Sequence, residues 1–107
     1  MAKLERTLTG NFDQILSRIE EGILSGSSSA TLEDKSDFRC GDTRCSVRVF
    51  ERYSYFGGNR VSLSVTLFSC NDIINLSAIT SGGSQAVFFK INTLGEEAFL
   101  EKLRKIL

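Results

Sequence analysis

Residues 45–70 read CSVRVFERYSYFGGNRVSLSVTLFSC, and this stretch decides the fold. Apolar and polar residues alternate along both of its arms, from Cys45 to Tyr55 and from Val61 to Cys70, and the alternation breaks between them. Alternation with a period of two is typical of a strand that buries one face, and glycine or asparagine supplies the positive φ angles of a tight turn. The stretch therefore predicts a β-hairpin.

The alternation also predicts the register of this hairpin. A three-residue loop over Gly57-Gly58-Asn59 sets Tyr53 opposite Leu63 and Val49 opposite Leu67, so that apolar residues meet across the two strands. The core-facing residues of the first arm are then Cys45, Val47, Val49, Glu51, Tyr53 and Tyr55.

Two turns extend the sheet beyond Cys70. Asn71-Asp72 has the composition of a two-residue type I′ turn, which pairs Cys70 with Ile73 and aligns Val65 with Ala78. The glycine-rich loop 81–84 then leads into a strand predicted over residues 85–91. Its predicted partners are Thr80 with Gln85, Ala78 with Val87, Leu76 with Phe89 and Ile74 with Ile91.

A further turn, over residues 41–44, extends the sheet on the other side. It pairs Cys40 with Cys45 and sets Asp37 opposite Arg48. Opposite charges that face each other across two strands favour this register.

Two helices and a first strand complete the predicted architecture. Residues 2–8 alternate like a strand, Asn11 has the composition of a helix N-cap, and Thr93 begins a capping box before a C-terminal helix. The chain is predicted to be one α+β domain over residues 1–107, in the order strand, helix, five-strand meander, helix. Its antiparallel sheet has about six strands, and the two helices cover one face.

Composition excludes several classes of partner. Thirteen basic residues balance thirteen acidic ones, so we expect neither a nucleic acid nor a membrane as a partner. No run approaches the roughly 20 apolar residues that span a bilayer, and residues 1–8 lack the apolar core of a signal peptide. We expect a cytoplasmic protein.

The absence of histidine excludes Ser-His and Cys-His catalysis and histidine metal sites. Three cysteines, Cys40, Cys45 and Cys70, make a poor metal set because structural zinc takes four ligands. The predicted register suits a Cys40–Cys45 disulfide, but reduced thiols are favoured in a reducing compartment. We expect no enzyme activity, no cofactor and no metal.

Polar residues gather at one end of the predicted buried face, beneath two glycine loops. A carboxylate, two phenols, a hydroxyl and an amide in apolar walls suit a small-molecule site, with candidate residues Glu51, Tyr53, Tyr55, Thr80 and Gln85. The alternative interpretation is that the sheet twists there and Glu51 reaches solvent or pairs with an arginine.

The predicted outer face of the sheet carries large apolar residues among serines and threonines. Exposed aromatic residues that adjoin one another mark interaction surfaces, so this face predicts a homodimer interface with candidate residues Phe50, Phe68, Phe88 and Ile79. The sequence thus leaves two functions open: small-molecule binding between sheet and helices, or self-association through the outer face.

The element order resembles a shortened helix-grip architecture, the fold of START-like ligand-binding domains. That resemblance implies a sheet curled around a terminal helix with a ligand cavity between them. Four segments, 49–54, 57–62, 77–85 and 90–93, also look like those of a small bacterial family of unknown function. This second resemblance covers nearly the whole chain and implies no activity.

Overall fold

The computed structural model of the protein describes residues 1–54, 58–82 and 89–107. Its elements follow one another as β1 (Ala2–Leu8), α1 (Phe12–Ser25), β2 (Thr31–Cys40), β3 (Thr43–Ser54), β4 (Asn59–Cys70), β5 (Ile73–Gly82) and α2 (Phe89–Ile106). Over the described ranges, no helix is both long enough and apolar enough to cross a membrane.

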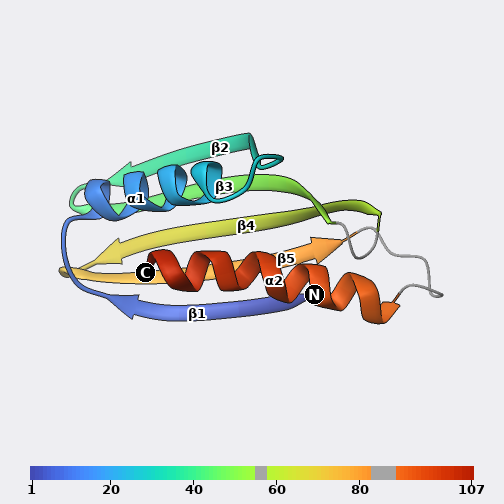
Figure 1. The fold of residues 1–107 in the computed structure, drawn as a ribbon. Helices are drawn as coiled ribbons and strands as arrows, with labels where there is room; N and C mark the ends of the chain where they lie inside the picture. Colours follow the sequence, from blue (N-terminus) through green and yellow to red (C-terminus); the bar gives the residue numbers. More distant parts are fainter. Residues whose placement is uncertain (55–57, 83–88) are drawn as a thin grey trace.

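The five strands form one antiparallel sheet in the order β1-β5-β4-β3-β2. Both helices lie on the same face of this sheet, α1 over the β2–β3 side and α2 over the β5–β1 side (Figure 1). The α+β class and the cover of one face by two helices are therefore confirmed. We call the helix-covered side the inner face and the opposite side the outer face.

The local predictions for β1 and α1 are confirmed. The side chain of Asn11 accepts a hydrogen bond from the backbone N–H of Gln14 at 2.9 Å, which caps α1. The helix buries the apolar stripe read from the sequence, consisting of Phe12, Ile15, Leu16, Ile19 and Ile23.

The turn between β4 and β5 is also confirmed. Asn71 and Asp72 have φ angles of 54° and 65°, the left-handed pair that a type I′ turn requires. Cys70 pairs with Ile73, and Val65 pairs with Ala78.

The predicted register of the central hairpin is wrong by three positions, an odd number. Ser54 pairs with Asn59, and Val49 lies opposite Ser64 rather than Leu67. Because neighbouring residues of a strand face opposite ways, this slip turns every side chain of β3 over. Arg48 and Phe50 face the core, whereas Val47 and Val49 face outward.

The predicted register between β2 and β3 is wrong as well. Cys40 pairs with Thr43 around a two-residue turn in which Gly41 has a φ of 60°, and Phe38 is the residue opposite Cys45. A bulge between Leu32 and Asp34 shifts the rest of β2 by one position.

The strand predicted over residues 85–91 is wrong at its described end, because Phe89 and Ile91 belong to α2. The partners of β5 come instead from β1, where Leu4 pairs with Ala78 and Leu8 pairs with Ile74. Gln85 and Val87 lie outside the described residues. The sheet therefore has five strands rather than six, and its edge is closed by a strand distant in sequence.

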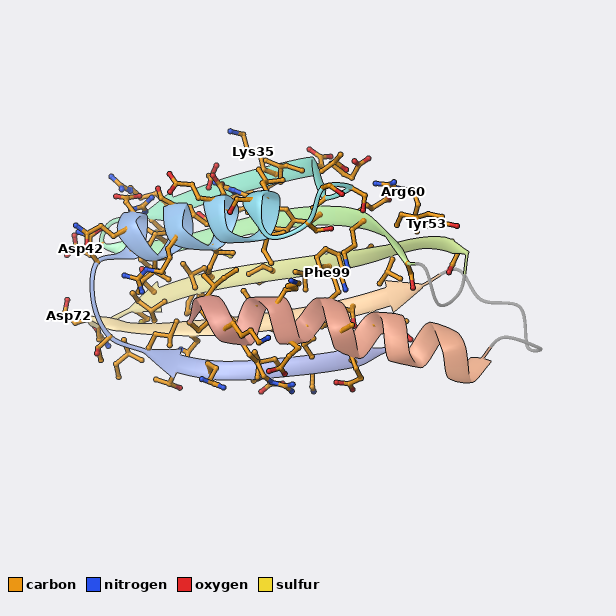
Figure 2. The ribbon with its side chains drawn as sticks, in the orientation of Figure 1. Lys35, Asp42, Tyr53, Arg60, Asp72 and Phe99 are labelled. Carbon is orange, nitrogen blue, oxygen red and sulfur yellow. The ribbon has the colours of Figure 1, made fainter. Side chains whose placement is uncertain are left out.

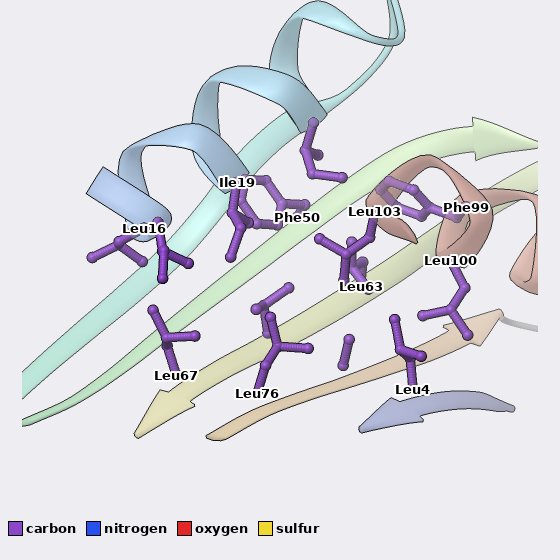
Figure 3. Packing of buried hydrophobic residues seen from close by; sticks show 14 of the residues in the cluster. Leu4, Leu16, Ile19, Phe50, Leu63, Leu67, Leu76, Phe99, Leu100 and Leu103 are labelled. Carbon is purple, nitrogen blue, oxygen red and sulfur yellow. The ribbon is translucent and has the colours of Figure 1, made fainter. Parts of the chain in front are cut away.

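The core lies between the inner face and the two helices. Leu63, Leu67 and Leu76 rise from the sheet, and side chains from both helices meet them, as Figure 3 shows for Ile19, Phe99, Leu100 and Leu103. Neither helix covers the outer face, and no other described element lies on it (Figure 1).

Candidate functional site

The outer face is the candidate functional surface, because the large exposed apolar side chains gather on it. Among the described residues, seven large hydrophobic side chains are exposed, and five of them point outward from the sheet. These five are Phe38 (66% exposed), Ile73 (47%), Tyr53 (41%), Phe68 (39%) and Ile79 (39%).

The middle of the outer face carries no charged side chain over most of its length. Its outward residues are Cys45, Val47 and Val49 in β3, Ser62, Ser64, Thr66, Phe68 and Cys70 in β4, and Ile73, Asn75, Ser77, Ile79 and Ser81 in β5. Depletion of charge at the centre with charge at the rim is the composition of protein interfaces.

Charged groups of the outer face pair with one another near its edges. On the edge strand β1, Lys3 lies 3.0 Å from Glu5. Where β3 meets the start of β4, Nε of Arg60 lies 2.9 Å from Oε1 of Glu51. These two pairs are neutral, whereas Asp34 on the edge strand β2 also points outward and has no ion-pair partner among the described residues.

Several polar side chains of this face also find partners within the sheet. The Ser62 hydroxyl donates to the carbonyl oxygen of Ser81 at 3.1 Å, and the Thr7 hydroxyl donates to the side-chain oxygen of Asn75 at 3.2 Å. A hydroxyl that is satisfied inside the sheet loses little when water leaves the surface.

The outer face has two unlike ends. Tyr53 and Arg60 lie at one end, and the turns that contain Asp42 and Asp72 lie at the other (Figure 2). We call the second the apolar end, formed by Phe38, Cys40, Cys45, Phe68, Cys70 and Ile73. A hollow of about 220 Å³ opens there, lined by Phe38, Arg39, Cys40, Thr43, Cys45 and Phe68.

The structure does not bring the predicted ligand residues together. Glu51 and Tyr53 point to the outer face, whereas Thr80 is fully buried on the inner face and its hydroxyl donates to the carbonyl oxygen of Ala2 at 3.4 Å. Tyr55 and Gln85 lie outside the described residues. The prediction that these residues share one face is wrong because of the slip in β3, and Glu51 pairs with an arginine as the alternative interpretation expected.

The predicted interface residues divide in the same way. Phe68 and Ile79 lie on the outer face as expected. Phe50 is fully buried among the core residues, so its assignment to the interface is wrong. Phe88 lies outside the described residues.

The predicted pairing of Cys40 with Cys45 is wrong, whereas the thiols are reduced as expected. Cys40 and Cys45 are not cross-strand partners, and all three cysteines are free. Within the described part of the chain, no group of three or more Cys, His, Asp or Glu side chains is arranged to hold a metal ion.

Sequence reasoning missed a row of arginines on the inner face of β3. Arg44, Arg48 and Arg52 are spaced four residues apart, so they share a face in any strand. That spacing is a visible signal, but the alternation of Cys45, Val47 and Val49 predicts that the opposite face of β3 is the buried one.

Two of these arginines have carboxylate partners on other elements. Arg48 is only 5% exposed, and its guanidinium contacts Glu20 of α1 at 2.5 Å and Asp37 of β2 at 3.0 Å. Arg44 lies 2.8 Å from Asp13 in the first turn of α1 and stacks over the Phe12 ring, with 4.3 Å to its centroid. These pairs fasten α1 to the sheet.

The pKa values of the two aspartates reflect these contacts. The Ser46 hydroxyl, 2.6 Å from Asp37, and then the Arg48 guanidinium hold the pKa of that carboxyl below its usual 3.8. A hydrogen bond from Arg44 likewise lowers the pKa of Asp13. Both carboxyls are therefore held in the charged form.

Arg52 differs from the other two arginines because no acidic side chain pairs with it among the described residues. Its guanidinium stacks over Phe99 of α2 at 4.6 Å from the ring centroid, and burial lowers its pKa. Within the described ranges, its buried Nε and the hydroxyl of Ser54 have no hydrogen-bond partner. Two polar groups thus remain unsatisfied between β3 and α2.

Comparison with solved structures supports the fold. The chain is similar to PA94, a protein of unknown function from Pseudomonas aeruginosa, at 6% sequence identity and a TM-score of 0.54, with 94% of this chain and 82% of that chain covered. At this identity the likeness shows the fold alone. Chr148 from Cytophaga hutchinsonii is 11% identical and covers 96% of this chain and 88% of that one, but its TM-score of 0.39 carries no argument.

The comparisons do not confirm the resemblance to START-like domains, and no curated protein matches the sequence. The resemblance to a family of unknown function is supported along the whole chain. The model of the family described as "Family of unknown function (DUF6054)" matches residues 1–107, and the chain belongs to that family.

Proposed function

We propose that this protein is a cytoplasmic, non-catalytic interaction module that self-associates through the outer face of its sheet. The observation that carries the proposal is the gathering of five exposed large apolar side chains on one uncovered, mostly charge-free face. Three of the five, Phe38, Phe68 and Ile73, adjoin one another at the apolar end, and exposed apolar side chains that adjoin mark association sites on soluble proteins.

The size of the outer face suits a stable interface. Five strands about 4.8 Å apart, each about 10 residues long with about 3.3 Å per residue, span roughly 800 Å². Specific interfaces bury about 800 Å² on each partner. Contact over the full face would therefore reach the standard size without help from other elements.

A second copy of the chain is the occupant that the charges favour. In a two-fold symmetric contact the same patch meets itself. Among the described residues, the centre of the outer face has no charged side chain with which a charged partner could pair. The ion pairs Lys3–Glu5 and Glu51–Arg60 are already formed within the chain. An identical face can therefore cover the centre of the patch without burying an unpaired charge there, while Asp34 stays at the β2 edge.

Light scattering and sedimentation over a range of protein concentrations test this proposal. We expect a dimer that Ser64→Glu converts to a monomer, because Ser64 lies in the middle of β4 and two like charges would be buried at the interface. Ser17→Glu, on the exposed side of α1, is the matched control and should leave the dimer intact. A wild-type chain that stays monomeric at the highest soluble concentration contradicts the proposal.

A second candidate function is the binding of a small anion between the sheet and α2. It is favoured by Nε of Arg52 and the hydroxyl of Ser54, which are buried there without hydrogen-bond partners among the described residues. A carboxylate would satisfy both groups through charge-assisted hydrogen bonds. A ligand in this position is also what the resemblance to helix-grip domains implies.

Thermal unfolding with acetate, succinate and inorganic phosphate tests the second candidate. An anion that binds the folded state raises the melting temperature, and the stabilisation grows with the logarithm of one plus the ratio of the anion concentration to Kd. We expect Arg52→Gln to abolish that rise, while Arg104→Gln on the exposed side of α2 keeps it. Equal shifts in both variants would show a general salt effect and reject the candidate.

A further inference from the structure

The three cysteines of the chain, distant in sequence, meet at the apolar end of the outer face. They come from three adjacent strands: Cys40 ends β2, Cys45 lies near the start of β3, and Cys70 ends β4. Cys40 and Cys70 are exposed and Cys45 is half-buried. All three point outward, beside Phe38 and Phe68.

Sheet geometry keeps these thiols apart within one chain. Cys40 lies opposite Thr43, and Cys70 lies one step beyond the Arg44–Ser69 pair, so Thr43 stands between them. Two strand spacings separate Cys40 from Cys70 by about 10 Å, and Cys45 is a diagonal neighbour of each at about 7 to 8 Å. Disulfides need Cα atoms within about 7 Å, so the three thiols face solvent as separate reactive groups.

The strand order places these thiols differently with respect to a second copy. β4 is the middle strand of five, so Cys70 lies on the midline of the outer face, with Phe68 two residues away and Ile73 opposite. Cys40 ends β2, which is an edge strand (Figure 1). Both thiols lie at the apolar end, so Cys40 is at a corner of the face and Cys70 is at the middle of that end. A copy seated on the outer face therefore covers Cys70 more fully than Cys40.

We propose that this thiol cluster is a modification site at which a charged, low-molecular-weight disulfide controls self-association. The inference rests on the proposed function, because it assigns a regulator to the same outer face. Mixed-disulfide formation at Cys70 and dimer formation exclude each other: the dimer hides the Cys70 thiol, and the attached group blocks the second copy.

The reaction is a thiol–disulfide exchange that needs no other oxidant. The Cys70 thiolate attacks one sulfur of the small disulfide, a new bond forms between Sγ and that sulfur, and the original bond between the two halves breaks. The second half leaves as a thiolate, which takes up the proton that Cys70 released. Cys70 is oxidised, and the departing half is reduced.

The attached group opposes association for two physical reasons. It adds bulk on the middle strand of the face, where close packing of a second copy depends on small outward side chains such as those of Thr66 and Cys70. When it is charged, as a glutathionyl group is, its burial without a partner adds a desolvation cost. A thiol at the edge of the face carries neither penalty, because the group extends into solvent.

Single-cysteine variants measure the two positions separately. One chain carries Cys40→Ser and Cys45→Ser and keeps Cys70, and its matched control carries Cys45→Ser and Cys70→Ser and keeps Cys40. Oxidised glutathione is the probe, mass spectrometry gives the rate of mixed-disulfide formation, and light scattering gives the oligomeric state of both variants.

We expect Cys70 to react about fivefold more slowly at a chain concentration tenfold above the dimer dissociation constant, where about one fifth of the chains are monomeric. Cys40 should be slowed less than Cys70 at the same concentration. Chains modified at Cys70 should be monomeric, and reduction should restore the dimer.

The outcomes separate this inference from the proposed function. A dimer in which Cys70 reacts as fast as in the monomer, or which survives modification at Cys70, overturns the inference and leaves the self-association proposal standing. A chain that is monomeric before any modification overturns both. Equal protection of Cys40 and Cys70 also overturns the inference, because it places both thiols inside the contact.

Discussion

Arg48 and Asp37 form an ion pair on the inner face, with 3.0 Å between Nη2 and Oδ1, although they are not cross-strand partners. Asp37 lies opposite Ser46, so the guanidinium reaches across a diagonal while it also contacts Glu20 of α1. One side chain thus joins β2, β3 and the first helix.

Removal of this guanidinium should destabilise the fold. In Arg48→Met, the carboxylates of Glu20 and Asp37 are exposed enough to be hydrated again. The free energy lost is therefore that of the charge-assisted hydrogen bonds made by Arg48, which is only 5% exposed. We expect urea unfolding to show a decrease of about 1.5 to 3 kcal/mol in the free energy of unfolding. Arg104→Met removes an exposed pair with Glu101 and should cost less than about 1 kcal/mol. Equal losses in both variants would contradict this prediction.

The lowered pKa of Asp37 predicts a specific dependence of stability on pH. The folded chain holds this carboxyl charged at pH values where the unfolded chain has begun to protonate it, so its stabilisation is complete above the usual pKa of 3.8. As the pH falls below that value towards the folded pKa, the stabilisation is lost. We therefore expect the difference in free energy of unfolding between wild type and Asp37→Asn to shrink between neutral pH and pH values below 3.8. A difference that stays constant over this range would show that Asp37 contributes nothing through its charge.

Arg52 should behave in the opposite way to Arg48, although both lie on the inner face of β3. Its guanidinium is desolvated without a carboxylate partner among the described residues. Arg52→Met removes the desolvated charge and keeps a sulfur contact with the Phe99 ring, so we expect the free energy of unfolding to be unchanged or raised by up to about 1 kcal/mol. Urea unfolding beside Arg48→Met checks this result, and a comparable loss in both variants would refute it.

The arginine row also shows why part of the fold could be predicted from the sequence and part could not. The Asn71-Asp72 turn was predictable because its two positive φ angles depend on local residues alone. The face of β3 was not, because Val47 and Val49 suggested an inner face, whereas Arg48 is buried through partners on α1 and β2. The hydrophobic pattern identifies the buried face of a strand only where no partner on another element allows polar side chains to be buried instead.

The edge strand that pairs with β5 could not be predicted from the sequence, for a different reason. Residues 85–91 follow β5 directly and alternate like a strand, whereas β1 is more than sixty residues away and pairs with β5 through Leu4 and Ala78. Strands that are neighbours in sequence usually pair, so the local choice was favoured. The same limit applied to the candidate ligand site, since its five residues were placed on one face by the slipped register.

The packing of α2 on β3 gives a last prediction, at Gly95. An added Cβ at this position would clash with the Ser54 hydroxyl and lie 3.2 Å from the Ser54 Cβ. Alanine favours a helix over glycine by about 1 kcal/mol, but overpacking of a close backbone contact costs about 1 to 3 kcal/mol. We therefore expect Gly95→Ala to lower the melting temperature.

Two variants test that cause directly. Ser54→Gly combined with Gly95→Ala removes the atoms that clash, so the double variant should be more stable than the sum of the two single changes predicts. Gly22→Ala in α1 is the comparison variant, because its new Cβ would lie 2.6 Å from Cδ1 and Cγ1 of Ile106, which are side-chain atoms at the end of α2 rather than in a sheet strand. If the double variant shows only additive losses, the close contact between Ser54 and Gly95 is not what requires glycine in α2.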